Sequence, residues 1–230
     1  MLTRHELAAM IDHTLLRPEA TAADIDRLCD EAARFEFVAV CVNPIWVARC
    51  VKRLGGTPVC VASVAGFPLG ASRSEIKVDE ARRAIEDGAV EVDMVIRVGD
   101  LIDGHVSAVR DDIAAVAGAV HAASKQSILK VILETAALSE QQIIAGCRCA
   151  AEAGADFVKT STGFHPSGGA TVEAVQLLRA NARGMKVKAA GGIRTLESAL
   201  ALIRAGADRL GCSSGVQIVQ QLPLLEEPSA

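Results

Sequence analysis

The sequence predicts an α/β protein of the (β/α)8 TIM-barrel class with an extra helix at its N-terminus. Short apolar runs rich in β-branched residues alternate with segments of helical period along the whole chain. Three segments, DGAVEVD, AGADFVK and AGADRLG, repeat a glycine at the same predicted helix end. The length of 230 residues is about that of eight β/α units. A doubly wound open sheet is the alternative arrangement of these elements.

The predicted strands are near-continuous apolar runs, which favour a parallel sheet covered by helices on both faces. An N-terminal helix is predicted to begin at Thr3, because Glu6 completes a capping box with it. The eight predicted strands comprise residues 11–16, 37–43, 59–66, 91–99, 128–135, 157–163, 186–193 and 209–214.

Helices are predicted between these strands. Ser139 and Gln142 have the spacing of a capping box, and Leu196, Leu200 and Ile203 recur at helical spacing. A glycine at the end of a helix fits a left-handed turn. The repeated glycines are Gly88, Gly154 and Gly206.

The composition is typical of one large globular domain, with 50% hydrophobic and 23% charged residues and no linker or low-complexity tract. We therefore expect residues 1–230 to form a single domain. A net charge of −4 offers no broad basic surface, which argues against nucleic acid as a partner. No apolar run approaches the roughly 20 residues of a membrane span, and the N-terminus does not resemble a signal peptide. A cytoplasmic protein without a membrane partner is expected.

The cysteines and histidines do not predict a metal centre. Seven cysteines without a CxxC pair are expected to be reduced thiols packed as small hydrophobic side chains, Cys41 among them. The five histidines show neither HxH nor HExxH spacing, although His13 and His165 lie where they could line a pocket. We expect no metal and no cofactor.

Two lysines and one aspartate lie on predicted strands whose carboxyl ends would form the reactive face of a barrel. Lys159 precedes TSTG on the sixth strand, Lys188 precedes AAGGI on the seventh, and Asp93 lies in EVDMV on the fourth. A buried ammonium is costly unless it is paired or loses its proton. A structural ion pair between Lys159 and Asp93 would explain one lysine, but not two.

The second lysine favours catalysis, since a like charge in a water-poor site lowers a lysine pKa. A pKa of roughly 7 instead of about 10.4 would raise the neutral fraction of the amine on the order of 1,000-fold. A neutral amine attacks a carbonyl and forms a Schiff base. We therefore predict Lys159 as the nucleophile, Lys188 as the cation that tunes its pKa, and Asp93 as the group that moves protons.

Three glycine-rich segments, TSTG, AAGGI and GCSSG, end the sixth, seventh and eighth predicted strands. Their backbone N–H groups and the start of the following helix favour an anion, and such barrels commonly hold phosphate after strands seven and eight. Each segment alone is explained by an ordinary tight turn. Together they predict a phosphorylated carbonyl compound as the substrate.

Motifs in order along nearly the whole chain resemble one family. They are IDHTLL, AVCVNP, GFPLG, EVDMVI, LKVILET, FVKTSTGF, KAAGGIRT and LGCSSG. These stretches resemble the deoxyribose-phosphate aldolases. The resemblance implies a (β/α)8 barrel and a metal-free class I aldolase, which reversibly cleaves 2-deoxy-D-ribose 5-phosphate to acetaldehyde and D-glyceraldehyde 3-phosphate.

The resemblance also assigns residues to roles. It implies that Lys159 forms the Schiff base, that Lys188 tunes it and that Asp93 relays protons. It further implies a phosphate cradle, which consists of Gly163, Gly191, Gly192, Ser213 and Ser214.

Two departures from the family's pattern put rate and substrate range in question. Arg97 takes the place of a usual asparagine, and the chain contains no tyrosine, so its tail QLPLLEEPSA lacks the C-terminal tyrosine that some members use.

A homo-oligomer is expected, with a dimer as the working hypothesis. Two alternative functions stay open: a different Schiff-base aldolase or transaldolase, and a sugar-phosphate-binding protein that has lost catalysis.

Overall fold

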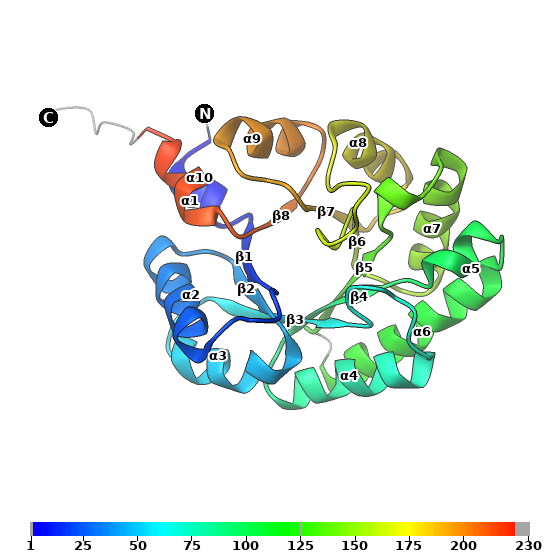
Figure 1. Ribbon diagram of the computed structural model, residues 1–230, viewed down its shortest axis with the longest axis horizontal. Helices are drawn as coiled ribbons and strands as arrows, with labels where there is room; N and C mark the ends of the chain where they lie inside the picture. Colours follow the sequence, from blue (N-terminus) through cyan, green and yellow to red (C-terminus); the bar gives the residue numbers. More distant parts are fainter. Residues whose placement is uncertain (1, 125, 224–230) are drawn as a thin grey trace, which may run out of the picture.

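Eight parallel strands close into a barrel in the computed structural model, which describes residues 2–124 and 126–223 (Figure 1). Consecutive strands pair with each other and the last pairs with the first, so the predicted (β/α)8 barrel is confirmed and the open sheet is wrong. The strands are β1 (Ile11–Leu15), β2 (Ala39–Val42), β3 (Cys60–Ala65), β4 (Glu91–Val95), β5 (Ile128–Ile132), β6 (Phe157–Lys159), β7 (Lys186–Ala190) and β8 (Arg209–Cys212).

Helices surround the barrel on its outside (Figure 1). None of the described helices combines the length and the apolar composition that a membrane crossing requires. The helices are α1 (Arg4–Ala8), α2 (Ala22–Phe35), η1 (Pro44–Trp46), α3 (Val47–Leu54), α4 (Ser74–Glu86), α5 (Val98–Ile102), α6 (Val106–Ala123), η2 (Thr135–Ala137), α7 (Glu140–Glu152), α8 (Val172–Asn181), α9 (Leu196–Arg204) and α10 (Gly215–Gln221).

The predicted helix signals have the expected geometry. Thr3 and Glu6 form the capping box of α1, which confirms the extra N-terminal helix, and Ser139 forms the corresponding box of α7. The Arg4 side chain ties α1 to the end of α10 by donating to two backbone carbonyls there. The three repeated glycines have φ angles of 103°, 81° and 113°, as left-handed turns require.

Several strands end earlier than predicted. The fourth strand was predicted to reach residue 99 but ends at Val95, because α5 begins at Val98. The sixth ends at Lys159, because the Thr162 backbone N–H turns away from the sheet and donates to Glu134. Such endings depend on contacts from other strands, so apolar pattern alone does not locate them.

The helix predicted from the spacing of Leu196, Leu200 and Ile203 is confirmed as α9. These three side chains are half-buried, and Ala199 and Leu202 are the buried residues of the helix. The small Ala199 side chain faces the barrel, and the larger side chains lie at the edges of the contact.

Side chains alternate between two environments along the strands. Outward residues such as Val92, Leu129 and Val187 are buried in the main apolar core between strands and helices. Their neighbours in sequence, such as Asp93 and Lys188, lie in the barrel interior and are also buried. The barrel therefore encloses charge within an apolar shell.

A substitution at Gly70, in the loop after β3, tests how closely this loop packs against its neighbours. The φ of Gly70 is 68°, and an added Cβ would lie 1.9 Å from the Ile96 carbonyl oxygen. Gly70→Ala is expected to lower the free energy of unfolding by about 1–3 kcal/mol, because backbone atoms must shift. Gly118→Ala in α6 is the matched control, since nothing lies within 4 Å of its added Cβ and alanine favours a helix by about 0.5–1 kcal/mol. Urea unfolding of both variants measures the difference, and equal stabilities would contradict this account.

Candidate active site

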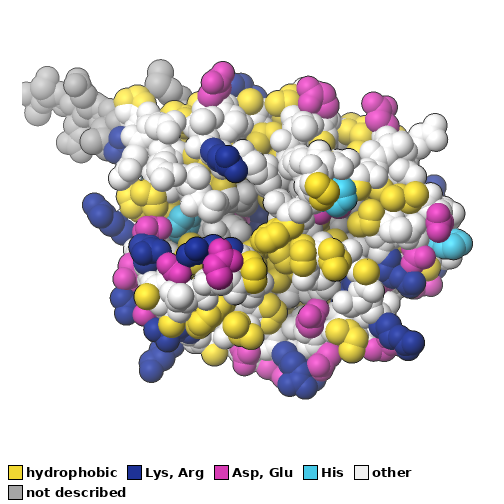
Figure 2. Space-filling model, in the orientation of Figure 1, with side chains coloured by type: hydrophobic (Ala, Val, Ile, Leu, Met, Phe, Trp, Pro, Cys, Tyr) yellow, Lys and Arg dark blue, Asp and Glu magenta, His cyan; other side chains and the backbone are white. Residues whose placement is uncertain are grey.

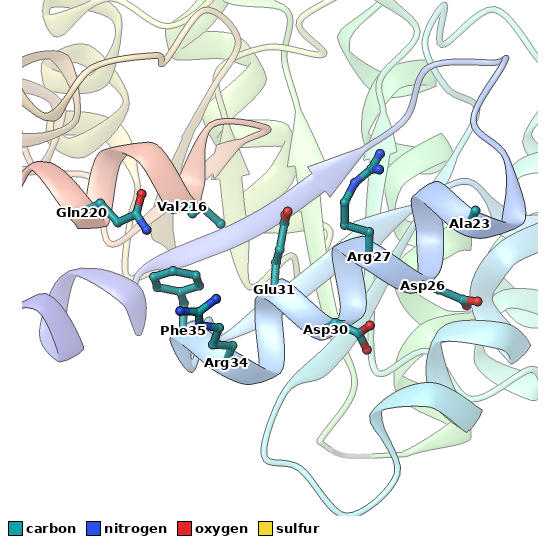
Figure 3. Close-up of a pocket in the computed structure, with 9 residues that line it drawn as sticks. All are labelled: Ala23, Asp26, Arg27, Asp30, Glu31, Arg34, Phe35, Val216 and Gln220. Carbon is teal, nitrogen blue, oxygen red and sulfur yellow. The ribbon is translucent and has the colours of Figure 1, made fainter.

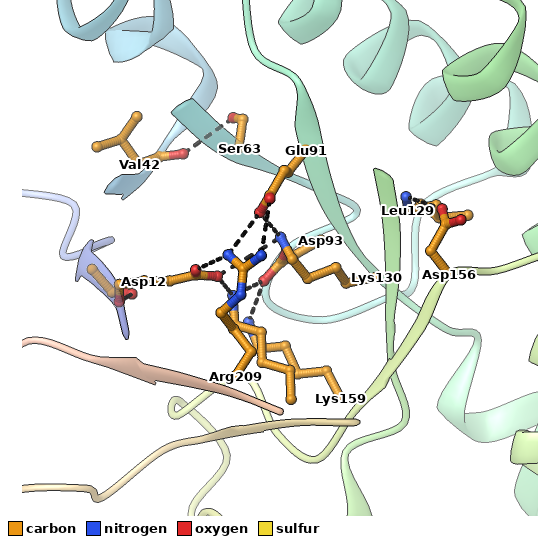
Figure 4. A network of polar contacts seen from close by, with 12 residues as sticks. Asp12, Val42, Ser63, Glu91, Asp93, Leu129, Lys130, Asp156, Lys159 and Arg209 are labelled. Atoms are coloured by element: carbon orange, nitrogen blue, oxygen red, sulfur yellow. Dashed lines mark hydrogen bonds and ion pairs between the residues drawn. The ribbon is translucent and has the colours of Figure 1, made fainter. Parts of the chain in front are cut away.

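A network of charged side chains fills the interior of the barrel (Figure 4). Each of its members is at most 9% exposed. The carboxylates are Asp12, Glu91 and Asp93, and the cations are Lys130, Lys159, Lys188 and Arg209.

Asp93 on β4 lies at the centre of this network and contacts three ammonium groups. Its Oδ1 accepts a hydrogen bond from Lys130 at 2.8 Å. Its Oδ2 accepts from both Lys159 and Lys188, each at 2.7 Å. Lys159 and Lys188 are also register partners on β6 and β7. The structure thus brings together the three residues that the sequence predicted as catalytic.

The other cations each contact two carboxylates or more. Lys188 also donates to Asp12, and Lys130 lies 2.5 Å from Glu91. Arg209 donates to Asp12 at 2.5 Å and to Glu91 at 3.2 Å, and Figure 4 shows it between these two side chains. Among the described residues, Lys159 has ion-pair contact with Asp93 alone. Lys159 is therefore the least compensated cation of the network.

The pKa shifts follow from this arrangement. Burial lowers the pKa of Lys159; the Asp93 carboxylate opposes that shift, and the Lys188 ammonium reinforces it. Burial also disfavours charge on Lys188, but Asp12 and Asp93 outweigh burial and raise its pKa. Burial would raise the pKa of Asp93, but Lys130 and the other two lysines hold it well below its usual range. Lys159 is thus the lysine of the network that loses its proton most readily.

The charge count of the network points the same way. Four cations face three carboxylates, so the network is neutral when one cation loses its proton. Because an arginine keeps its charge and the other lysines have raised pKa values, that cation is Lys159. The sequence-based explanation named burial in a water-poor site and the Lys188 charge together as the cause of the shift. The structure gives burial as the larger cause, with Lys188 as a contributor.

A cavity of about 290 Å³ opens beside Lys159 at the carboxyl ends of the strands. It is lined by residues that end or follow β1, β6, β7 and β8, and Lys159 is the one member of the charged network in its lining. Gly163, Gly191, Gly192 and Ser213 of the predicted phosphate cradle also line it. The volume is at the lower end of that of small-molecule sites.

The cradle glycines adopt conformations that leave backbone groups accessible. Gly163, Gly191 and Gly192 have φ angles of 85°, 93° and 78°. A Cβ on Gly191 would lie 2.9 Å from the Gly169 Cα, so the two loops approach too closely for a side chain. Ser214 is the exception among the cradle residues, because it does not line the cavity and instead precedes α10.

Several functional candidates were missed in the sequence. These residues are Lys130, Asp12, Glu91 and Arg209. Glu91 lies two residues before Asp93 on β4, and the alternation of inward and outward positions is the signal that could have grouped all four. The cavity is also lined by two guanidinium side chains, Arg17 after β1 and Arg194 after β7. Arg194 directly follows the GGI segment, which is a signal that could have been used.

Other candidates from the sequence lie outside the cavity lining. His13 is a buried residue of β1 whose Nε2 lies 2.7 Å from Glu31, so the suggestion that it lines the pocket is wrong. His165 does not line the cavity either; its Nδ1 accepts a hydrogen bond from the backbone of Ser167. Arg97 pairs with Asp100 at 2.5 Å. Within the described residues, no group of histidine, cysteine and acidic side chains has an arrangement that could hold a metal ion.

Cys41 lies in a small apolar cluster near the charged network. It packs with Leu16, Ala62 and Val64, as the sequence predicted for a packed thiol. Burial, helped by the Asp93 charge, raises the pKa of Cys41 to about 11. The thiol is therefore protonated at neutral pH.

Hydrophobic side chains gather near the centre of the face that Figure 2 shows, while charged groups lie mainly at its periphery. Phe164 lines the cavity and meets Phe67 edge to face, with ring centroids 5.4 Å apart. Phe164, packed against Phe67, thus gives the cavity an apolar wall beside its cationic groups.

A second depression lies between α2 and α10 on the outside of the barrel (Figure 3). Its volume is about 460 Å³, and two of its carboxylates, Asp26 and Asp30, are already paired with Arg49 and Arg53. Since it contains no member of the charged network, the cavity beside Lys159 is the candidate active site.

Comparisons with known proteins agree on one family. A family model described as DeoC/LacD family aldolase matches residues 7–221. The deoxyribose-phosphate aldolase of Thermococcus gammatolerans is 55% identical over 94% of this chain and 96% of its own length. That of Caldicellulosiruptor saccharolyticus is 49% identical over 96% of this chain and 100% of its own. A solved deoxyribose-phosphate aldolase from Aeropyrum pernix, described as tetrameric, has a TM-score of 0.88 and 33% identity, and the match covers 95% of this chain and 91% of that one.

Lys130 gives a test of the charged network. Lys130→Met leaves Glu91 and Asp93 short of a buried partner, so we expect it to lower the free energy of unfolding by about 3–5 kcal/mol. Lys186→Met is the control, because Lys186 begins β7 and is exposed, and its loss should change stability by less than about 0.5 kcal/mol. Chemical denaturation measures both, and a Lys130 variant as stable as the control would show that the network does not stabilise the fold.

Proposed function

This chain is an aldolase that belongs to the DeoC/LacD family, and we propose from that premise that it reversibly cleaves 2-deoxy-D-ribose 5-phosphate to D-glyceraldehyde 3-phosphate and acetaldehyde. One observation carries the proposal: Lys159 is the member of the buried network that has both a lowered pKa and access to the cavity. These are the properties that a Schiff-base nucleophile requires.

The first step is formation of the Schiff base. The neutral Lys159 amine adds to the C1 aldehyde of the open-chain sugar, and the resulting carbinolamine loses water to leave an iminium ion. The iminium carries the positive charge that the ammonium had, so the pairing with Asp93 at 2.7 Å is kept. Asp93 thereby favours the intermediate as well as the protonated lysine.

Bond cleavage follows from the electron demand of the iminium. The C3 hydroxyl loses its proton, the C2–C3 bond breaks, and its electron pair moves to C2 and the iminium nitrogen. The products are D-glyceraldehyde 3-phosphate and the enamine of acetaldehyde. Protonation of the enamine carbon and hydrolysis release acetaldehyde and restore the Lys159 amine.

Asp93 is proposed to move the protons in these steps, and Lys188 is proposed to tune the nucleophile. The ammonium groups around Asp93 hold its pKa low, so Asp93 passes a proton on rather than retaining it. Lys188 touches the same carboxylate oxygen as Lys159 and has a raised pKa, so it stays charged while the nucleophile is neutral. It therefore keeps positive charge beside the nucleophile throughout the cycle.

The glycine-rich loops are proposed to bind the substrate's phosphate. Gly191 and Gly192 have successive positive φ angles, and backbone N–H groups in turns of glycine-rich loops suit an anion. Gly163 and Ser213 line the same cavity, and Ser214 precedes α10 immediately behind them. These residues would place the phosphate at the rim, away from Asp93.

We further propose that residues 1–230 act as a single catalytic domain in the cytoplasm, without a nucleic-acid partner. A homo-oligomer is proposed as well, with a dimer as the first state to test. Residues 224–230, which include most of the tail QLPLLEEPSA, lie outside the described residues.

Chemical trapping tests the nucleophile. Incubation with acetaldehyde and borohydride is expected to leave an ethyl group on Lys159, because reduction converts the iminium into a stable secondary amine. Peptide mapping by mass spectrometry locates the adduct. It should disappear in Lys159→Ala and persist in Lys186→Met, which removes an exposed lysine from the neighbouring strand.

The outcome also separates the alternative functions. Trapping with a hydroxylated ketone but not with acetaldehyde would favour another Schiff-base aldolase. Binding of a sugar phosphate without any adduct or cleavage would favour a protein that has lost catalysis. An ethyl adduct on a lysine other than Lys159 would contradict the proposed nucleophile.

The pH profile tests the role of Lys188. Lys188→Met removes a cation that lowers the Lys159 pKa and leaves the Asp93 carboxylate, which raises that pKa, with fewer partners. Because Lys159 attacks only when neutral, activity rises with pH through its pKa. The rising limb of log kcat/KM should therefore move to higher pH by about one unit or more. Lys186→Met is the control. If the rising limb of Lys188→Met stays at the same pH as that of the unmodified chain, Lys188 does not tune the nucleophile.

A further inference from the structure

Closure of the barrel gives the proposed phosphate site a wall that sequence order does not suggest. β8 pairs with β1, so the loop after β1 lies beside the loop that carries Ser213. Thr14, Leu15, Leu16 and Arg17 accordingly line the same cavity as the glycine-rich loops. A residue close to the N-terminus thus reaches a site otherwise built from the last third of the chain.

The charged side chains that line this cavity are all cations. They are Arg17, Lys159 and Arg194, and no carboxylate is among the described lining residues. Lys159 is reserved for chemistry and is neutral when it attacks. The two guanidinium groups, from opposite ends of the sequence, then supply the positive charge that a doubly charged phosphate requires.

Arg17 is held in place by acidic side chains outside the cavity lining. It lies 3.0 Å from Asp24 and 3.6 Å from Glu19. Asp24 is itself fixed by the capping box of α2, where hydrogen bonds from Thr21 lower its pKa to about 2. A guanidinium has five N–H donors, so two carboxylate contacts leave donors for a ligand. Arg17 is therefore oriented beforehand rather than free to rotate.

We propose that Arg17 is a specificity-determining residue that contacts the substrate's phosphate and selects phosphorylated over unphosphorylated sugars. This inference rests on the proposed function and adds to it a charged contact from outside the glycine-rich motifs. The expected contact is a charge-assisted hydrogen bond, which is lost when the guanidinium is removed.

Arg27 supplies a matched control. Its guanidinium pairs with the same Asp24, at 2.5 Å, and Figure 3 shows it extending from α2 toward β1. It does not line the cavity beside Lys159. Arg17→Met and Arg27→Met therefore remove the same charge from the same carboxylate, and only the first removes a cation from the cavity.

The test compares cleavage of 2-deoxyribose 5-phosphate and of 2-deoxyribose by the full chain. For Arg17→Met, kcat/KM with the phosphorylated sugar is expected to fall about tenfold, mainly through KM, while the value for the free sugar stays within about twofold. Arg17→Lys should recover part of the loss, because it keeps the charge but not the fork of donors. Arg27→Met should leave both values unchanged.

A second measurement does not depend on turnover. Inorganic phosphate should raise the Tm of the unmodified chain and of Arg27→Met more than that of Arg17→Met, because a ligand stabilises the folded state in proportion to its affinity. An unchanged preference for the phosphorylated sugar in Arg17→Met, or an equal loss in Arg27→Met, would overturn the role of Arg17. If the unmodified chain cleaves neither sugar, the proposed function fails instead, and the phosphate measurement still decides whether Arg17 binds the anion.

Discussion

The structure depends on one shared carboxylate. Asp93 lies inside a closed barrel and is hydrogen-bonded to three lysine ammonium groups, two of them on the same oxygen. Neither the aspartate nor the lysines could be buried alone, because an unpaired charge in an apolar interior is too costly. Lys130, Lys188 and Arg209 also contact Asp12 or Glu91. Lys159 contacts Asp93 alone and so has the least compensating negative charge. Burial lowers the pKa of Lys159, and the network does not offset that shift as it does for Lys188, which has two carboxylate partners.

Stability and chemistry therefore use the same groups. The cations that lock the strands together at the barrel centre also affect the protonation state of the proposed nucleophile, since removing any one changes both the pairing and the field at Lys159. The apolar residues outside the strands exclude water from the network and strengthen these interactions. A site of this kind is rigid, because each charged side chain except Lys159 is fixed by partners from two or three strands.

The sequence predicts this architecture well where the signal is local. Eight apolar runs with helices between them predict a barrel, and a barrel brings Lys159, Lys188 and Asp93 to one end. What the sequence did not predict depends on pairing between distant strands. Asp12 and Arg209 meet across the closing seam of the barrel, and each seemed an isolated charge beside apolar residues. The early end of β6 and the position of Arg17 have the same origin, because both are set by contacts far along the chain.

The separation of Lys159 from the arginines at the rim of the cavity has an electrostatic consequence for the proposed reaction. With Lys159 neutral, the buried network has three cations for three carboxylates, so the remaining positive charge at the cavity is that of Arg194 and of Arg17, which also contacts Asp24. A bound phosphate neutralises that rim. Iminium formation then adds a positive charge at Lys159 in a cavity that already contains a dianion, and attraction between unlike charges in a water-poor site favours this step. A sugar without phosphate would form the same iminium beside these arginines with no anion in the cavity. The phosphate can thus contribute to the chemical step as well as to binding, although it takes no part in the bonds that change.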